Sequence, residues 1–152
     1  MTLVNKDRIL EIAQQFIDEG RLDRAIKEYE KILDVDPHDI RIKIKMAELE
    51  VRRKRIPDAI KLYREVAERY ENENFYLKAV TVYKGILKLN PSLIDINEKL
   101  AGLYHKMGLI SDAVRQYEIL AVALEQQSMW ERLLDVRRKI SELVPKDGSA
   151  RV

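Results

Sequence analysis

Apolar residues recur at every third or fourth position along most of the chain, a spacing that places them on one face of an α-helix. Glycine, proline and short polar clusters interrupt this pattern and mark the ends of the predicted helices. The stretch IRIKIK, residues 40–45, alternates like a strand, but it lies inside a longer helical pattern and is therefore also predicted to be helical. The pattern predicts eight helices, at residues 6–19, 22–35, 39–55, 57–72, 75–89, 93–107, 111–127 and 129–143.

An internal repeat organises these helices. Pro37, Pro91 and Pro145 each close an apolar run and stand 54 residues apart. Residues 38–91 align without gaps on residues 92–145, with 15 of the 54 positions identical, which indicates a duplication. We therefore expect a single helical-repeat domain over residues 1–145, made of a partial unit 4–37 and full units 38–91 and 92–145, and a flexible tail at 146–152.

The repeated positions resemble the tetratricopeptide repeat family, in which large, small and aromatic residues alternate at fixed offsets before a closing proline. The resemblance implies an all-α fold, a right-handed α-solenoid of about eight antiparallel helices, and a role in binding peptides or protein surfaces. Two sets of residues carry the pattern in full: Ile9, Ile12, Ala13, Phe16, Ala25, Tyr29 and Pro37, and Tyr63, Val66, Ala67, Tyr70, Ala79, Tyr83 and Pro91.

The predicted helix 57–72 fits the family pattern in two registers, as the second helix of one repeat and as the first helix of the next. Ala59 and Ala67 lie at opposite flanks of its apolar face. Because small residues let helix backbones approach closely, we expect Ala59 to face the preceding helix and Ala67 the following one. The same arrangement recurs at Ala113 and Ala121.

Composition narrows the function classes. The chain has 152 residues, of which 46% are hydrophobic and 36% charged, and its formal net charge is only +2. This balance predicts a folded chain without a general attraction to nucleic acid or to a membrane surface. No stretch has the length of an uncharged membrane helix, and the first residues lack the pattern of a signal peptide. We therefore expect a cytoplasmic protein.

Candidate chemistry is sparse. The absence of cysteine excludes disulfides, thiolate zinc sites and a cysteine nucleophile. The two histidines, His38 and His105, are far apart in the sequence, and no phosphate-binding loop or nucleophile motif occurs. We therefore predict a protein that is not an enzyme and needs no cofactor.

A row of charged residues on the predicted helix 39–55 is the first candidate binding site. Arg41, Lys45, Glu48 and Arg52 lie between two apolar faces of this helix, and three of the four are basic. This basic stripe fits an acidic segment of a partner. It also fits a solvated flank whose closing run, RRKR at 52–55, complements the negative end of the helix dipole.

The second candidate emerges from comparing the two full units. Ile119, Val122 and Ala123 occupy the positions of Glu65, Glu68 and Arg69 in the preceding unit. The helix 111–127 is thus apolar nearly all round, so either a neighbouring helix or another chain is expected to cover it. Met129 and Trp130 follow at the next turn and are expected to extend this apolar patch.

These observations predict a protein-interaction scaffold that binds another protein or peptide, with an acidic segment as the candidate ligand. Two further readings stay open: a homo-oligomerisation module that uses Ile119, Val122 and Ala123, and a nucleic-acid-binding helical repeat supported only by the RRKR run. The array starts out of phase with its unit, which fits a fragment of a longer repeat array.

Overall fold

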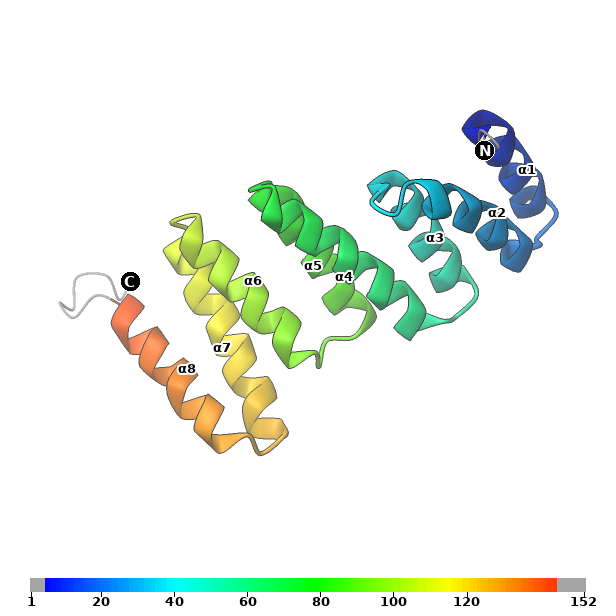
Figure 1. The fold of residues 1–152 in the computed structure, drawn as a ribbon. Helices are drawn as coiled ribbons and strands as arrows, with labels where there is room; N and C mark the ends of the chain where they lie inside the picture. Colours follow the sequence, from blue (N-terminus) through cyan, green and yellow to red (C-terminus); the bar gives the residue numbers. More distant parts are fainter. Residues whose placement is uncertain (1–4, 145–152) are drawn as a thin grey trace. The chain divides into compact units, whose positions relative to one another are not determined.

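The computed structural model describes residues 5–144, which form eight α-helices and no strand (Figure 1). All eight predicted helices are confirmed, with each end within three residues of the prediction, and residues 40–45 are helical. The predicted tail at 146–152 lies outside the described residues. The helices are α1 (Lys6–Asp18), α2 (Leu22–Val35), α3 (Ile40–Arg52), α4 (Ile56–Asn72), α5 (Tyr76–Leu89), α6 (Ile94–Lys106), α7 (Ile110–Gln126) and α8 (Trp130–Leu143).

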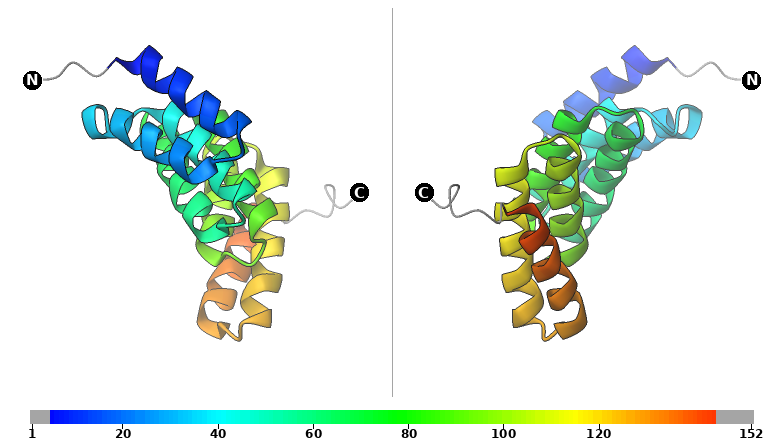
Figure 2. Two further views of the ribbon diagram at one scale, coloured as in Figure 1. Left: turned by 90° about the vertical axis from the view of Figure 1, so that its right-hand side faces the viewer. Right: turned by 90° about the vertical axis from the view of Figure 1, so that its left-hand side faces the viewer.

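The helices fall into two compact units, one up to Arg69 and one from Tyr70 onward. In the first unit α1 packs against α2, and α2 packs against α3. In the second unit α5 packs against α6, α6 against α7 and α7 against α8, and neighbours such as α7 and α8 run antiparallel (Figure 2). The chain is therefore an all-α helical-repeat fold, while the single domain over 1–145 and the right-handed superhelix stay predictions.

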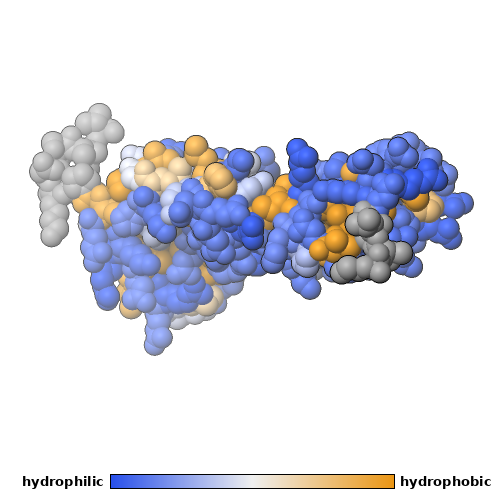
Figure 3. All heavy atoms as spheres, turned by 45° about the horizontal axis from the view of Figure 1, so that its top comes forward, coloured by the Kyte–Doolittle hydropathy of each residue, from blue (hydrophilic) through white to orange (hydrophobic). Residues whose placement is uncertain are grey.

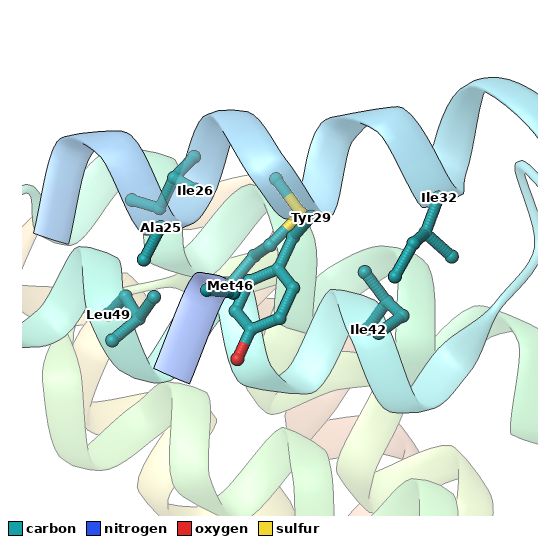
Figure 4. Packing of buried hydrophobic residues seen from close by; sticks show 8 residues of the cluster. Ala25, Ile26, Tyr29, Ile32, Ile42, Met46 and Leu49 are labelled. Carbon is teal, nitrogen blue, oxygen red and sulfur yellow. The ribbon is translucent and has the colours of Figure 1, made fainter. Parts of the chain in front are cut away.

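The core of the first unit lies where α2 meets α3. Ile26, Tyr29 and Ile32 of α2 point toward Ile42, Met46 and Leu49 of α3 (Figure 4). The three α3 residues are spaced by four and three positions, so they form one stripe on that helix. This stripe is the apolar face that the sequence places toward a neighbouring helix.

The core of the second unit joins three helices around α7. Its buried residues come from α6, α7 and α8, with α7 in contact with both of the others. Ala113 is fully buried in this cluster, and Ala121 packs against it. α7 thus packs against both of its neighbours, while the assignment of Ala113 to the preceding helix and of Ala121 to the following one stays a prediction. The buried residues of this cluster are Ala101, Ala113, Tyr117, Leu120, Leu124, Leu133 and Val136.

Five of the seven turns between helices share one conformation. In the α6–α7 turn, the Leu109 backbone N–H donates to the Tyr104 carbonyl at 2.9 Å and Gly108 N–H donates to the His105 carbonyl at 3.0 Å. This is a Schellman ending, in which one residue takes a positive φ. The residues with positive φ are Gly20, Lys54, Asn74, Gly108 and Ser128.

The other two turns, α2–α3 and α5–α6, contain Pro37 and Pro91 and use a side chain instead. Asp36 Oδ1 accepts from the His38 backbone N–H at 3.3 Å, and Asn90 Oδ1 accepts from the Ser92 N–H at 3.1 Å. Such a side chain takes the place of a backbone turn, and the proline that follows it cannot continue the preceding helix. Both kinds of turn recur at the 54-residue interval of the sequence repeat.

The close approach of helices at alanine gives a first prediction. Ala59 and Ala67 of α4 are both fully buried. Ala59→Leu and Ala67→Leu should each lower the free energy of unfolding by about 1–3 kcal/mol, because the larger side chain overpacks a filled site. Lys61→Leu, at an exposed position of the same helix, is the control and should be nearly neutral. Equal thermal stability of the three variants, measured by circular dichroism, would contradict the shared-helix packing.

The turns give a second prediction. A Cβ at Gly108 would meet no atom within 4 Å, so Gly108→Ala tests the positive φ alone. It should cost about 1 kcal/mol of unfolding free energy. Lys54 occupies the equivalent turn with φ 61°, and Lys54→Gly should be neutral or stabilising by up to about 1 kcal/mol. Chemical denaturation of both variants checks this, and a loss of similar size for both would refute the turn account.

Candidate functional site

The basic stripe occupies the outer side of α3. Arg41, Lys45, Glu48 and Arg52 are all exposed, as predicted. Their spacing of four, three and four residues aligns them along one side of the helix. Within residues 5–144, no ion pair includes Arg41, Lys45 or Arg52, so the three cations remain available to a ligand.

Two tyrosine side chains approach the acidic member of the stripe. Burial, and then the negative charge of Glu48, raise the pKa of Tyr29 on α2 and of Tyr63 on α4. Glu48 is therefore within electrostatic reach of both phenol groups. The sequence assigned Tyr29 and Tyr63 to packing positions only. The choice of tyrosine over phenylalanine at these positions could have indicated a nearby polar group, because the hydroxyl of a buried tyrosine needs a hydrogen-bond partner.

The N-terminal end of α3 is fixed by Asp39. Its Oδ1 accepts from the Ile42 backbone N–H at 3.2 Å, and Lys6 Nζ donates to its Oδ2 at 2.7 Å. Burial acts to raise the pKa of Asp39, but the Lys6 contact and the backbone hydrogen bonds outweigh it and lower the pKa. Asp39 is therefore ionised at neutral pH and holds the helix start that presents Arg41.

At the C-terminal end of α3, some residues of the RRKR run stabilise the end of the helix and others are exposed at the surface. Arg53 Nη1 donates to Oε1 of the buried Glu50 at 2.9 Å, and Lys54 forms the turn with positive φ. Arg52 remains exposed. Part of this run thus serves the end of the helix, which weakens the nucleic-acid reading and leaves Arg52 to the stripe.

The second predicted site also reaches the surface. Ile119 is 48% exposed and Val122 55%, while Ala123 is half-buried. Their side of α7 is therefore not covered by the described residues. Glu65, the counterpart of Ile119, forms an ion pair with Lys43 at 3.1 Å, so the position is not simply solvated in the first unit. The expected extension is only partial, because Met129 packs against the core of the second unit and only Trp130 of the two is exposed.

An apolar hollow in the second unit was missed in the sequence. It has a volume of about 410 Å³ and lies between the α4–α5 turn and the end of α6. Phe75 and Leu77 at its edge are exposed, and Lys78 Nζ lies 5.1 Å from the Phe75 ring centre. Figure 3 shows hydrophobic atoms gathered on this unit. Lys78 covers only part of this patch, because its charged end lies over the Tyr70 and Phe75 rings.

The described residues offer little for catalysis. Between residues 5 and 144, no three His, Cys, Asp or Glu side chains are placed to hold a metal ion. His38 and His105 are exposed and belong to different units. The mixed-charge hollow beside α8, of about 340 Å³, is lined by residues such as Glu98 and Arg132, which pair with each other. No helix in the described part of the chain is long and apolar enough to cross a membrane.

Comparison with known families agrees with the repeat pattern. Residues 16–80 match the tetratricopeptide repeat model. These residues belong to the tetratricopeptide repeat family. The matched segment contains the whole of the basic stripe on α3, whereas Ile119, Val122 and Ala123 lie outside it.

Solved structures similar to this chain are helical-repeat proteins of low sequence identity. MamA is 19% identical, with a TM-score of 0.39, and the match covers 87% of this chain and 94% of MamA. The type III secretion translocator chaperone SycD of Yersinia enterocolitica is 12% identical, with a TM-score of 0.40 and coverage of 90% and 81%. YrrB, a tetratricopeptide repeat protein with an unusual peptide-binding site, is 13% identical, with a TM-score of 0.38 and coverage of 91% and 86%. No curated protein matches the chain.

Proposed function

We propose that this tetratricopeptide repeat chain is a non-enzymatic protein-interaction scaffold that binds an acidic peptide segment along α3. The observation that carries the proposal is the row of three exposed cations, Arg41, Lys45 and Arg52, none of which is used in an ion pair among the described residues. Helical repeats present such rows on rigid elements, so little ordering is needed at the protein's side of the contact.

The spacing of the stripe suggests the form of the ligand. At a rise of ~1.5 Å per residue, Lys45 lies ~6 Å along the helix from Arg41, and Arg52 lies ~10 Å beyond Lys45. An extended peptide advances ~3.3 Å per residue and points every second side chain to the same face, so acidic residues at its first, third and fifth positions would face the three cations. The long side chain of Arg52 spans the remaining distance of about 3 Å to the fifth position. Glu48 lies between Lys45 and Arg52 and disfavours a fourth carboxylate there.

The proposal assigns no catalytic step and no cofactor to the chain. It places the interaction in the cytoplasm, in keeping with the absence of cysteine. Nucleic acid is a weaker ligand class, because the net charge is only +2 and Arg53 is held by Glu50.

A peptide titration tests the stripe. A labelled hexapeptide with glutamate at its first, third and fifth positions should bind the parent chain with an affinity that falls as salt rises, since the contact is charge-based. Arg41→Glu with Lys45→Glu and Arg52→Glu should weaken binding at least about tenfold, from the loss of three charge-assisted contacts. Fluorescence anisotropy measures the affinity, and circular dichroism checks the helical content.

The matched control changes three exposed lysines elsewhere by the same charge, as Lys27→Glu, Lys61→Glu and Lys84→Glu. This variant should bind within about twofold of the parent if position, and not net charge, decides binding. A peptide of the same composition in scrambled order should also bind more weakly. Equal binding by both triple variants would reduce the stripe to a solvated flank.

Homo-oligomerisation is the second candidate function, favoured by the exposure of Ile119 and Val122 on α7. Burying each of these side chains would gain roughly 1.5–3 kcal/mol, but a stable interface needs about 1,000 Å² in total. The two residues would therefore form only the centre of a larger contact.

Light scattering on Ile119→Glu with Val122→Glu tests this candidate. Because both side chains are about half exposed, the variant should stay folded, and it should lose any self-association that the parent shows. Glu118→Lys, an exposed charge change on the same helix, is the control and should keep the parent's mass. A parent that is monomeric at all concentrations, or a variant that associates like the parent, would remove oligomerisation from the account.

A further inference from the structure

The apolar hollow between the α4–α5 turn and the end of α6 carries two lysines at its edge. Phe75, Tyr76 and Leu77 are among the residues that line it. Lys78 Nζ lies 5.1 Å from the centre of the Phe75 ring, and Lys106 Nζ lies 5.1 Å from the centre of the Tyr76 ring. Both lysines are exposed, and neither forms an ion pair with another described residue. The hollow therefore combines apolar surface with two positive charges that have no carboxylate partner.

The equivalent place in the first unit is charged. Four charged residues of its two turns become apolar 54 residues later in the chain. They are Arg21, Asp23, Arg53 and Arg55, and their counterparts are Phe75, Leu77, Met107 and Leu109. Phe75 is 50% exposed and Leu77 69% exposed, so the change puts large apolar side chains at the surface. Such a local gathering of exposed apolar residues is typical of a contact with another molecule.

The charges at the edge of the hollow restrict what it can bind. Because Lys78 and Lys106 each lie over a ring, a cationic ligand would meet a positive charge at both aromatic side chains and be repelled. The aliphatic Leu77 offers a nucleic-acid base no plane to stack on. The lysines instead favour an apolar side chain that has carboxylates beside it.

The first unit presents a segment of this kind at the end of α2. Val35 is 65% exposed and stands between two exposed acids, Asp34 and Asp36. Neither acid forms an ion pair with another described residue. Lys6, which lines the same small hollow as Val35, is paired with Asp39. The Asp34–Asp36 segment thus offers one apolar side chain and two carboxylates to another molecule.

The two units differ in complementary ways. The second unit has Lys88, Leu89 and Asn90 where the first has the Asp34–Asp36 segment, so it lacks both carboxylates. The first unit has charged residues where the second has the apolar hollow. Each unit therefore carries one half of a possible contact, and two copies of the chain can join only through unlike units.

We propose that the apolar hollow binds the Asp34–Asp36 segment of a second copy of this chain, so that copies associate head to tail. Val35 enters the hollow against Phe75 and Leu77, and the two acids approach Lys78 and Lys106.

This contact uses a different surface on each copy. It includes neither Ile119 nor Val122, and it shares no residue with the basic stripe, so it is independent of the proposed function. Since it centres on a single apolar side chain, it buries less than the about 1,000 Å² of a stable interface, and the association is weak.

Two variants each remove one half of the contact. The hollow variant, Phe75→Arg with Leu77→Asp, introduces the residue types of the first unit at exposed positions and keeps the net charge. The segment variant, Asp34→Lys with Asp36→Asn, introduces those of the second unit. Asn90 forms the equivalent turn there by accepting from the Ser92 N–H, so the segment variant should fold.

Sedimentation velocity up to about 1 mM chain measures the association. The average mass of the parent should rise with concentration, and each variant alone should stay monomeric. An equimolar mixture of the two variants should form a heterodimer and nothing larger, because the mixture retains one intact hollow and one intact segment. A two-fold symmetric interface that needs both regions would not be restored in this way.

A second pair of variants tests the charges. Lys78→Glu with Lys106→Glu should weaken the association of the parent at least about tenfold, because both carboxylates then meet like charges. The matched control, Lys84→Glu with Lys88→Glu, makes the same charge change at two other exposed lysines of the second unit and should associate like the parent. Circular dichroism checks that all variants are folded.

Four results would overturn the proposal. A parent that stays monomeric at about 1 mM has no such contact. A hollow variant or a segment variant that associates like the parent would exclude its surface from the interface. A mixture of folded variants without a heterodimer would exclude head-to-tail pairing. Loss of association in Ile119→Glu with Val122→Glu would assign the contact to α7. The hexapeptide titration of the basic stripe is unaffected by any of these results, so the two proposals fail separately.

Discussion

The structure depends on small residues that let one helix pack against two neighbours. On α7, Ala113 is fully buried in the cluster shared with α6 and α8, and the partly buried Ala121 packs against the same cluster. A helix can serve two neighbours in this way only where small side chains let both backbones come near. The second unit is therefore a layer of helices around α7, and not a series of independent hairpins.

Turn chemistry decides which helices are neighbours. The Schellman turns, with one residue at positive φ, reverse the chain within a few residues and pair successive helices tightly. The two proline turns, at Pro37 and Pro91, lie at the repeat boundary, where Asp36 and Asn90 cap the backbone by side-chain hydrogen bonds. The helix that follows each of these turns packs on α2 or on α5, where Ile26 and Val80 are buried. The equivalent residue of α8, Leu134, is exposed.

The candidate binding surface on α3 consists of charged residues that make no ion pair within the described part of the fold. Glu50 and Arg53 pair near the end of α3, and Gln116 Nε2 donates to the buried Asn97 Oδ1 at 2.8 Å, so these polar groups serve packing. The stripe cations have no such role among the described residues. Because a rigid helix holds them in a row, their spacing carries the specificity that we propose for an acidic ligand.

The sequence by itself determined the helices, their repeat and the outward direction of Arg41, Lys45 and Arg52, because helical periodicity and turn residues are local properties of the chain. Comparison of the two units also identified Ile119 and Val122 as apolar replacements of charged residues, but it left open whether the chain's own helices cover them, and the structure shows both about half exposed. Only the tertiary structure decided that Tyr29 and Tyr63 approach Glu48, that Met129 turns into the core, and that Leu134 stays exposed where Ile26 is buried. These facts depend on which helix covers which face, and the helical periodicity that α2 and α8 share does not encode that difference.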